Sequence, residues 1–523
     1  MSANNVSKLT REKPWIAVCV LFLLGLGIRL IGIKWGLPDL YHTFSYHPDE
    51  SLLLSVALRL DLVHGVWDPN FYNYGAGYLY LLHLITLGVN AYSTPSIAGY
   101  LLTARVANAL FGAGTVVVGY LIGKRLTNSI GAWATGLILA FAPAYVVHSR
   151  FATVDIPAVF FVSLSLLFAV KVLQSNAILR YALWGGVFAG LAAGFKYNAG
   201  LVIVAVIFAC WLATKYLRQR FSGIVLAMVG AVVAFLITTP GVIFNFTRFW
   251  EDFSFERGHM MNSNFDLTFQ QTPPGWIYHI VPNLSTGFGG LMLIFCVAGL
   301  IWGLTRCDKS IWIILSFGAL YFLMIGSFHV KFLRYTFPLY PVLALGGGYW
   351  LGRVWESSKW RWLGLGAFIV VLTYTLVPMM KTTGYMISLD PRDEAAKYIR
   401  DHTAGSKIGF AKVPWFYSPP LFPETNAPGP PQARLELMSK QPDLVMAQGA
   451  DWSLDLIWQI RPNYIILTQF ETMEEARLRL PEYEAFMDAL RGQYRLVNRW
   501  GEGFKAPHDL LYIHPEVQLW QRQ

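Results

Sequence analysis

Two acidic sites stand out in a sequence that carries few acids over its first 383 positions. Asp49 and Glu50 directly follow Pro48, and Asp155 directly precedes about twenty mostly apolar residues. A carboxylate that faces a polar cleft at the edge of a membrane can accept a proton from a hydroxyl nucleophile. We therefore predict that Asp49, Glu50 and Asp155 are catalytic residues, and that Asp49 or Glu50 accepts this proton.

Helix capping is the alternative explanation for the same acids. Carboxylates concentrate in the first turn of a helix, where they interact with unpaired amide groups and with the helix dipole. Asp49 and Glu50 precede a helical run from Ser51, and Asp155 precedes an apolar segment. The sequence leaves both interpretations open.

Four cations are expected near the same boundary. Lys331 and Arg334 lie three residues apart, a spacing that puts two side chains on one side of a helical turn. Arg150 and Lys196 are further candidates. Such groups hold anions through charge-assisted hydrogen bonds, but long basic side chains also anchor helices at the membrane interface. The residues alone leave anion binding and interface anchoring open.

His47 and Glu50 are candidate ligands for a divalent metal ion. Imidazole and carboxylate are both metal-binding groups, but no defined ligand spacing accompanies these two residues. The sequence therefore requires no cofactor, and a divalent metal ion remains an open expectation.

The composition indicates that apolar, membrane-spanning segments position these side chains. Of the 523 residues, 55% are apolar and 14% are charged, whereas soluble globular proteins carry about 25% charged residues. Several apolar stretches reach the roughly 20 residues that cross a bilayer. Residues 1–383 hold 26 Lys and Arg against 13 Asp and Glu, and residues 384–523 hold 15 against 18. The net charge of +10 therefore belongs to the apolar part, which argues against nucleic acid as a partner.

The apolar segments predict about eleven membrane-spanning helices. They fall at residues 15–37, 97–123, 130–148, 152–173, 181–196, 199–214, 222–245, 284–304, 310–328, 335–354 and 362–380. The stretch 181–214 is broken around Lys196, so it could form one span or two. A further apolar stretch, 76–90, is an alternative twelfth span, but it is short and would reverse every later span.

Basic residues predict the orientation of these spans. With a cytoplasmic N-terminus, every inside connection is basic, as the positive-inside rule expects. These residues are Lys124, Arg125, Lys171, Arg180, Lys215, Arg218, Arg220, Arg306, Lys309, Arg353, Lys359 and Arg361. We therefore predict a multi-pass membrane protein, in the plasma membrane if bacterial, whose residues 384–523 lie on the extracytoplasmic face.

The chain divides into a membrane domain, residues 1–383, and a tail domain, residues 384–523. Long outer loops are expected at 38–96 and 246–283, both rich in aromatic residues that suit the membrane interface. The tail reads as a small α/β domain. It has a predicted helix at 391–402, predicted strands at 408–413 and 464–468, and a helical pattern at 471–491 around Pro481. No catalytic motif was found in the tail.

Several segments, taken in order, resemble one family. They are Asp49-Glu50, 74–82, 105–125, 150–157 with Asp155, 194–198 and 331–335. Together they resemble the membrane glycosyltransferases that use polyprenyl-phosphate sugars, of the protein O-mannosyltransferase and aminoarabinose lipid A transferase type (glycosyltransferase family 39). The resemblance covers roughly residues 15–350, and an outer C-terminal domain also occurs in such enzymes.

The resemblance implies a fold, partners and roles. The fold would be a polytopic α-helical membrane protein of the GT-C type with a small C-terminal extracytoplasmic α/β domain. Asp49 would be the base that deprotonates a hydroxyl or amine acceptor on a lipid, glycan or protein. The acceptor would then displace polyprenyl phosphate from the anomeric carbon of the donor, with inversion. The cations that would bind this phosphate are Lys331, Arg334, Arg150 and Lys196. The other partners would be the surrounding membrane lipids.

A transporter or flippase is the rival interpretation. Eleven helices and intramembrane charges would suit one. The acids, however, cluster at the outer boundary rather than at mid-membrane, and no inverted repeat was found in the sequence. We therefore favour an enzyme.

Overall fold

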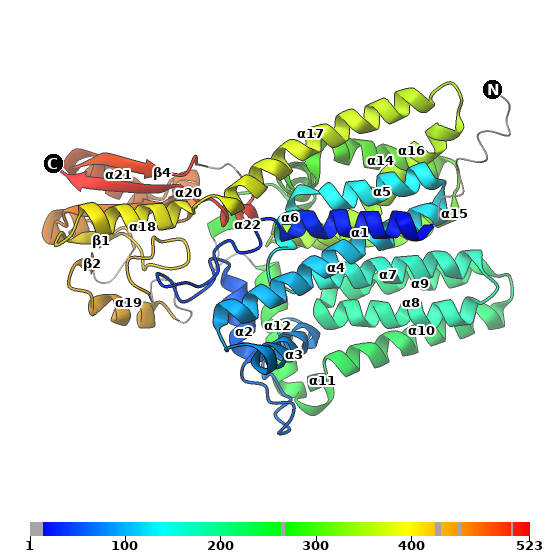
Figure 1. The fold of residues 1–523 in the computed structure, drawn as a ribbon. Coiled ribbons are helices and arrows are strands. Elements are labelled where there is room, and N and C mark those ends of the chain that lie inside the picture. The colour runs from blue at the N-terminus through cyan, green and yellow to red at the C-terminus, as the bar shows by residue number, and fades with distance from the viewer. Residues whose placement is uncertain (1–13, 263–266, 424–429, 448–450, 504–505) are drawn as a thin grey trace.

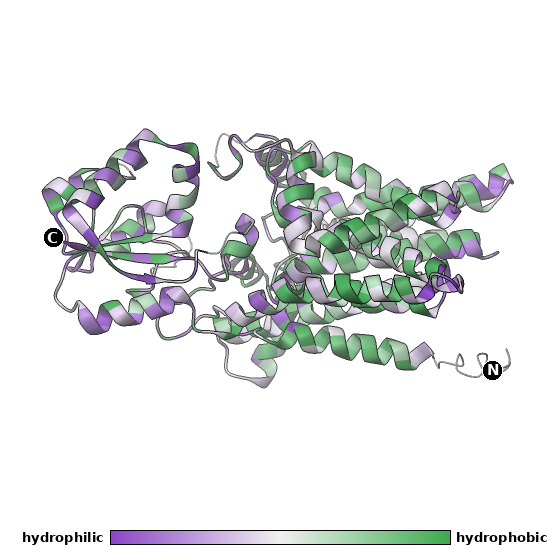
Figure 2. Ribbon diagram, turned by 90° about the horizontal axis from the view of Figure 1, so that it is seen from above, coloured by the Kyte–Doolittle hydropathy of each residue, from purple (hydrophilic) through white to green (hydrophobic). Residues whose placement is uncertain are grey.

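The computed structural model describes residues 14–262, 267–423, 430–447, 451–503 and 506–523. A bundle of long helices forms one end of the molecule and a small sheet flanked by helices forms the other (Figure 1). The bundle helices are hydrophobic along most of their length, whereas the helices around the sheet carry many hydrophilic residues (Figure 2). Both parts agree with the predicted fold class.

The bundle contains helices of very different lengths. The α-helices are α1 (Pro14–Leu30), α2 (Pro48–Ala57), α3 (Gly77–Tyr92), α4 (Ile97–Leu126), α5 (Ser129–Phe141), α6 (Pro143–His148), α7 (Asp155–Gln174), α8 (Ile178–Phe195), α9 (Ile203–Ala213), α10 (Leu217–Thr238), α11 (Gly241–Phe244), α12 (Phe246–Met261), α13 (Gly275–Tyr278), α14 (Gly290–Thr305), α15 (Lys309–Gly326), α16 (Tyr340–Glu356) and α17 (Arg361–Ile387). Tighter or wider helical turns are η1 (Tyr197–Val202), η2 (Leu267–Phe269), η3 (His279–Gly289) and η4 (Leu333–Leu339).

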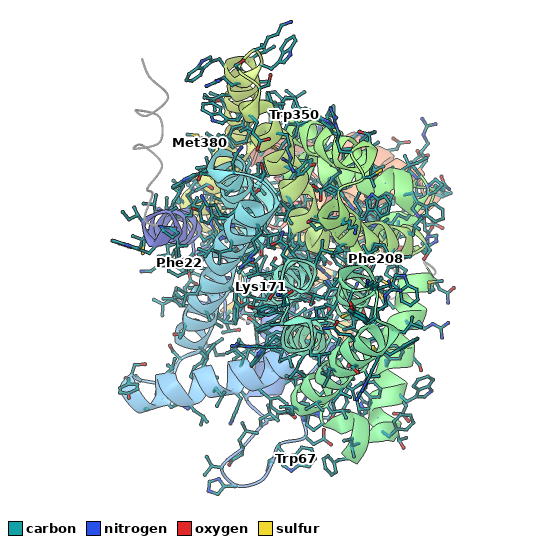
Figure 3. The ribbon with its side chains drawn as sticks, turned by 90° about the vertical axis from the view of Figure 1, so that its right-hand side faces the viewer. Phe22, Trp67, Lys171, Phe208, Trp350 and Met380 are labelled. Atoms are coloured by element: carbon teal, nitrogen blue, oxygen red, sulfur yellow. The ribbon has the colours of Figure 1, made fainter. Side chains whose placement is uncertain are left out.

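Each of the eleven predicted spans contains a helix of the bundle. Seven helices among the described residues are long and apolar enough to cross a membrane, and α1, α5 and the pair η1–α9 are shorter apolar helices. The stretch 181–214 forms two helices, α8 and α9, which separate at Lys196. Helix α3, the alternative twelfth span, lies across the others when the bundle is seen end-on (Figure 3). It therefore has the direction expected of an interfacial helix.

Close contact between α8 and α10 sets the position of Lys196. A Cβ atom added to Gly186 would lie 1.9 Å from the carbonyl oxygen of Ala227, and one added to Gly190 would lie 2.1 Å from that of Ala231. Two glycines four residues apart let helix backbones approach closely, as is common in membrane bundles. The end of α8, and with it Lys196, is therefore held firmly against its neighbours.

The tail forms a five-stranded sheet with the strand order β2-β1-β3-β5-β4. Its strands are β1 (Ile408–Phe410), β2 (Leu444–Met446), β3 (Tyr464–Thr468), β4 (Tyr494–Trp500) and β5 (Val517–Arg522). Strands β1, β2 and β3 are parallel, with Ile408 opposite both Leu444 and Tyr464. Strand β5 runs antiparallel to β3 and β4.

Helices cover both faces of this sheet. They are α18 (Pro391–His402), α19 (Pro431–Ser439), η6 (Leu456–Ile460), α20 (Gln469–Leu478), α21 (Pro481–Gln493) and α22 (His508–Leu511). On one face, Ile399 of α18 is in the same buried cluster as Ile466 of β3. On the other, Phe486 of α21 is in the same buried cluster as Ile465. Alternate side chains of β3 therefore belong to two small hydrophobic cores, one on each face of the sheet.

The predicted tail elements are partly correct. The helix at 391–402 and the strand at 464–468 have the predicted bounds, and Asp390 accepts a hydrogen bond from the backbone of Arg392 as an N-cap. The predicted strand at 408–413 is shorter, and the helical pattern at 471–491 forms two helices, α20 and α21. Helix α17 passes residue 383 and ends at Ile387, so the predicted domain boundary falls within a helix.

Candidate active site

Four of the predicted site residues line one cavity. Asp49, Asp155, Lys196 and Arg334 are all part of its wall. They come from the start of α2, the start of α7, the end of α8 and η4, respectively. This narrow cavity shares Asp49 and Arg334 with a larger one of about 500 Å³. Side chains far apart in the sequence thus meet at one end of the bundle.

Asp49 lines the cavity beside Arg334. It lies in the first turn of α2, where His47 occupies the N-cap position without a capping side-chain hydrogen bond. Its side chain is 26% exposed and lies 3.5 Å from Nη1 of Arg334. The helix start favours an acid here electrostatically. The carboxylate nevertheless faces the cavity, so both the capping and the functional interpretations apply to this residue.

Asp155 and Lys196 form a buried ion pair. Oδ1 of Asp155 lies 2.5 Å from Nζ of Lys196, and the two side chains are 5% and 9% exposed. Nζ also lies 4.8 Å from the centre of the Tyr335 ring. A lysine held between a carboxylate and an aromatic face has a fixed direction. This pair therefore supplies the cavity with a positioned cation rather than a mobile one.

Glu50 lines neither cavity, although it was predicted to face one cleft together with Asp49. Its carboxylate is completely buried and accepts two hydrogen bonds from Arg105, at 2.8 and 2.7 Å. It also accepts from the backbone amide of Ala152 at 2.6 Å. Burial alone would raise the pKa of Glu50, but the charge and hydrogen bonds of Arg105 bring that pKa below its usual value. Neighbouring residues of a helix point about 100° apart, which allows Asp49 to face the cavity while Glu50 faces Arg105.

The Glu50 carboxylate instead positions the segment that leads to Asp155. Ala152 is held by Glu50, and the side-chain amide of Asn108 donates to the carbonyl groups of Phe151 and Thr153, at 2.7 and 2.8 Å. These bonds satisfy backbone groups that would otherwise be buried without partners. The start of α7 is therefore fixed by buried polar residues of α2 and α4.

Lys331 and Arg150 do not line the cavity, so the structure brings only two of the four predicted phosphate-binding cations together there. Nζ of Lys331 donates to Oγ1 of Thr272 and to the carbonyl oxygen of Pro273. Helix η4 begins only at Leu333, so Lys331 and Arg334 do not share a helical turn. Arg150 donates to the carbonyl group of Ile28 and to the hydroxyl group of Thr383, where it ties α1 to α17.

His47 is a buried histidine beside the cavity. Within the described part of the chain, neither ring nitrogen of His47 has a hydrogen-bond partner. Burial lowers the pKa of His47 below its usual value, although Asp49 and Glu50 oppose this shift. No group of three His, Cys, Asp or Glu side chains in the described residues could hold a metal ion. With Glu50 bound to Arg105, the pair His47 and Glu50 does not fit the predicted metal site.

Glu256 of α12 was missed by the sequence analysis. It lines both the narrow and the large cavity together with Asp49 and Arg334. Burial raises the pKa of Glu256 above its usual value, against the opposing effects of His259 and of a hydrogen bond with the side chain of Asn73. The only sequence signal was its position in an aromatic loop, since Glu256 belongs to no recognised motif. A third carboxylate therefore faces the same space.

The tail also contributes an acid that was not predicted. Asp509 of α22 accepts a hydrogen bond of 2.9 Å from the backbone amide of Arg334. Burial raises the pKa of Asp509 to about 6, against the opposing charge of Arg334. Tyr512, one turn later, lines the large cavity and lies 5.2 Å from the ring of His47. The tail therefore contacts the residues that carry the predicted chemistry.

Comparisons with known sequences point to one family. Residues 96–244 match the family described as dolichyl-phosphate-mannose-protein mannosyltransferase. An uncharacterized protein of Aquifex aeolicus (strain VF5) is 24% identical over 243 residues, which cover 46% of this chain and 47% of that protein. The match thus spans about half the length of this curated relative.

Comparisons with solved structures cover nearly the whole chain. The crystal structure of ArnT from Cupriavidus metallidurans bound to undecaprenyl phosphate has a TM-score of 0.53 at 14% identity, over 97% of this chain and 98% of that chain. The apo crystal structure of the Archaeoglobus fulgidus oligosaccharyltransferase has a TM-score of 0.50 at 11% identity, over 96% and 76%. At 14% and 11% sequence identity, the similarity to these two structures shows the fold alone.

Proposed function

Because the chain has the fold of the GT-C glycosyltransferases and is a multi-pass membrane protein, we propose that it transfers a sugar from a polyprenyl-phosphate donor, with inversion. The acceptor is a hydroxyl or amine group on a lipid, glycan or protein. One observation carries the proposal: a carboxylate, Asp49, and two cations, Arg334 and Lys196, line one cavity although they come from distant parts of the chain.

The chemistry follows from these groups. Asp49 takes the proton of the acceptor hydroxyl or amine while the acceptor attacks the anomeric carbon of the donor. The bond between that carbon and the phosphate oxygen breaks on the opposite face, so the configuration is inverted. The phosphate leaves with one more negative charge. Arg334 and Lys196 stabilise this charge as it develops. Stabilisation of developing charge is usually the largest single contribution to catalysis.

Ion pairs hold these two cations in place before the donor binds. Arg334 lies beside Asp49 at 3.5 Å, and Lys196 beside Asp155 at 2.5 Å. A buried cation without a counter-charge is costly, so each needs a carboxylate when the donor is absent. In this proposal Asp155 is a positioning residue, because its ion pair with Lys196 holds the ammonium group at the cavity.

The nature of the donor is inferred from two relatives. The ArnT structure was solved with undecaprenyl phosphate bound, and the matching family is described by a dolichyl-phosphate-mannose activity. Both names contain a polyprenyl phosphate, whose single anionic phosphate matches the small group of cations in the cavity. The proposal therefore concerns the lipid phosphate and leaves the sugar open.

We expect the Arg334→Gln substitution to weaken binding of the donor. A charge-assisted contact contributes about 1.5–3 kcal/mol, which corresponds to a roughly ten- to hundredfold loss of affinity. The measurement is binding and consumption of a labelled polyprenyl-phosphate mannose by the purified protein in lipid vesicles. Lys331→Gln is the matched control, because Lys331 contacts Thr272 and Pro273 outside the cavity.

Donor binding that is equally strong in both variants would contradict the phosphate role of Arg334. A wild-type protein that neither binds nor consumes any polyprenyl-phosphate sugar would contradict the proposed function itself. Movement of labelled lipid across the vesicle membrane without donor consumption would favour the transporter or flippase.

We propose further that the tail and the cavity lie on the extracytoplasmic side. The basic connections between α16 and α17, and between α9 and α10, lie at the end of the bundle remote from the sheet (Figure 1). Reporter fusions after residues 220, 330 and 523 should therefore report inside, outside and outside. An inside signal after residue 523 would contradict this orientation.

A further inference from the structure

The large cavity has a second wall that belongs to the tail. Asp49, Glu256 and Arg334 are part of the wall from the bundle. The tail wall consists of residues from the segments 412–417, 470–475 and 508–512. With a volume of about 500 Å³, this space is in the range of cavities that enclose a small organic ligand. The cavity is therefore large enough for one or two sugar rings beside the reacting groups.

Aromatic rings dominate the tail wall. Tyr417, Phe470 and Tyr512 form a parallel stack, with ring centres 6.2 and 5.5 Å apart and interplanar angles of 14° and 3°. Trp415 lies 6.2 Å from Tyr417, nearly perpendicular to it. Of these rings, Trp415, Tyr417 and Phe470 are only partly buried. The stack runs from the tail toward His47 and thus toward Asp49.

Charged groups interrupt this aromatic surface. Lys412 and Glu475 form an ion pair beside it, and Glu474 and His508 also line the cavity. They supply several hydrogen-bond acceptors and donors next to the ring faces. The wall therefore combines flat apolar faces with polar groups, unlike the continuous apolar groove that a lipid chain would need.

The tail wall is tied to the bundle. The guanidinium group of Arg477 donates to the carbonyl oxygens of Gln270 and Leu267, at 2.7 and 3.0 Å. On the other side, Asp509 accepts from the backbone of Arg334. These contacts hold both sides of the cavity at a defined separation.

We infer that the tail wall binds a saccharide, which is the acceptor of the proposed transfer. A pyranose ring has an apolar face of C–H groups that stacks on an aromatic ring, and a rim of hydroxyl groups that bind carboxylates and amines. The wall offers both kinds of partner, and the cavity leads to the Asp49 carboxylate. This inference rests on the proposed function. It specifies the acceptor as a glycan rather than a peptide or a lipid hydroxyl group.

The test uses the full-length protein in detergent, with maltotriose, mannotriose and chitotriose as saccharide probes and a short threonine peptide as the competitor class. Binding is followed by saturation-transfer NMR. We expect at least one saccharide to bind and Tyr417→Leu to weaken it by about tenfold, the loss of one stacking contact. Tyr417→Phe keeps the ring and should bind as the wild type does.

Trp458→Leu is the matched control. Trp458 is 46% exposed and is not part of the cavity wall, so its loss should leave saccharide binding unchanged. Donor consumption is measured on the same samples. If the donor is bound but no saccharide binds, or if the peptide binds and Tyr417→Leu has no effect, this inference is overturned while the proposed function stands. If the donor is not bound at all, the proposed function fails first.

Discussion

Asp49→Asn is expected to reduce sugar transfer by about 100-fold or more while the protein stays folded in the membrane, since this is the usual scale for loss of a general base. The substitution keeps the size of the side chain but removes the proton acceptor. The measurement is the initial rate of transfer by equal amounts of purified wild type and variant in vesicles. Binding of the donor should change much less, because Arg334 and Lys196 are retained.

Stability is the control for this prediction. The Asp49 side chain is partly exposed, and the charge of Asp509 still acts on Arg334 in the variant, so the neutral variant should lose less than about 1 kcal/mol of unfolding free energy. A variant that transfers sugar at the wild-type rate would show that Asp49 acts only as a first-turn acid. Asp155→Asn should then show the large defect instead.

Glu50→Ala is expected to destabilise the protein by about 3–5 kcal/mol, since it leaves a buried guanidinium without its counter-charge. The Arg105 side chain is completely buried, and the Ala152 amide would lose its acceptor as well. The measurement is thermal unfolding of the detergent-solubilised protein. Low yield of folded protein, rather than slow transfer by a normal amount of it, is the expected phenotype.

Glu251→Ala provides the comparison. Glu251 is an exposed carboxylate of α12, and its removal should change the unfolding free energy by no more than about 0.5 kcal/mol. If Glu50→Ala were as stable as Glu251→Ala yet inactive, Glu50 would have a catalytic role that the buried ion pair does not suggest. The two adjacent acids thus have opposite expected phenotypes.

The sequence identified four residues of the cavity for a simple physical reason. Charged residues are costly in a membrane segment, so Asp155, Lys196 and Arg334 are conspicuous in an apolar chain, and Asp49 follows a predicted span. The predicted helical turn between Lys331 and Arg334 is wrong. Lys331 was paired with Arg334 by helical spacing, but the chain becomes helical only at Leu333.

The remaining part of the site depends on contacts between distant segments. Asp509 and Tyr512 belong to no motif. Asp509 reaches the backbone of Arg334, and Tyr512 lines the large cavity, only because α22 is docked on η4. Glu256 looked like an ordinary loop acid, because its burial comes from the surrounding fold. Likewise, adjacent carboxylates look alike in sequence, and only the position of Arg105 distinguishes Glu50 from Asp49.

The strands of the tail sheet were also only partly predictable from the sequence. The sequence predicts strand β3, because Tyr464-Ile465-Ile466-Leu467 is a continuous apolar run. Strand β4 contains Arg495, Asn498 and Arg499, and β2 has only three residues, so neither has a strong strand pattern. Pairing with neighbours, rather than local propensity, makes these segments strands.

Strand β5 lies between β3 and β4, although it follows both in the chain. Asp509, which holds the backbone of Arg334, lies just before β5 and is 175 residues from its partner. At about 5–20 residues per second, a ribosome needs roughly 9 to 35 s to add those residues. During translation the bundle is therefore inserted well before Arg334 acquires its support. A nascent chain interrupted in this interval would reside in the membrane as an unfinished, inactive protein, which separates insertion from the onset of activity in time.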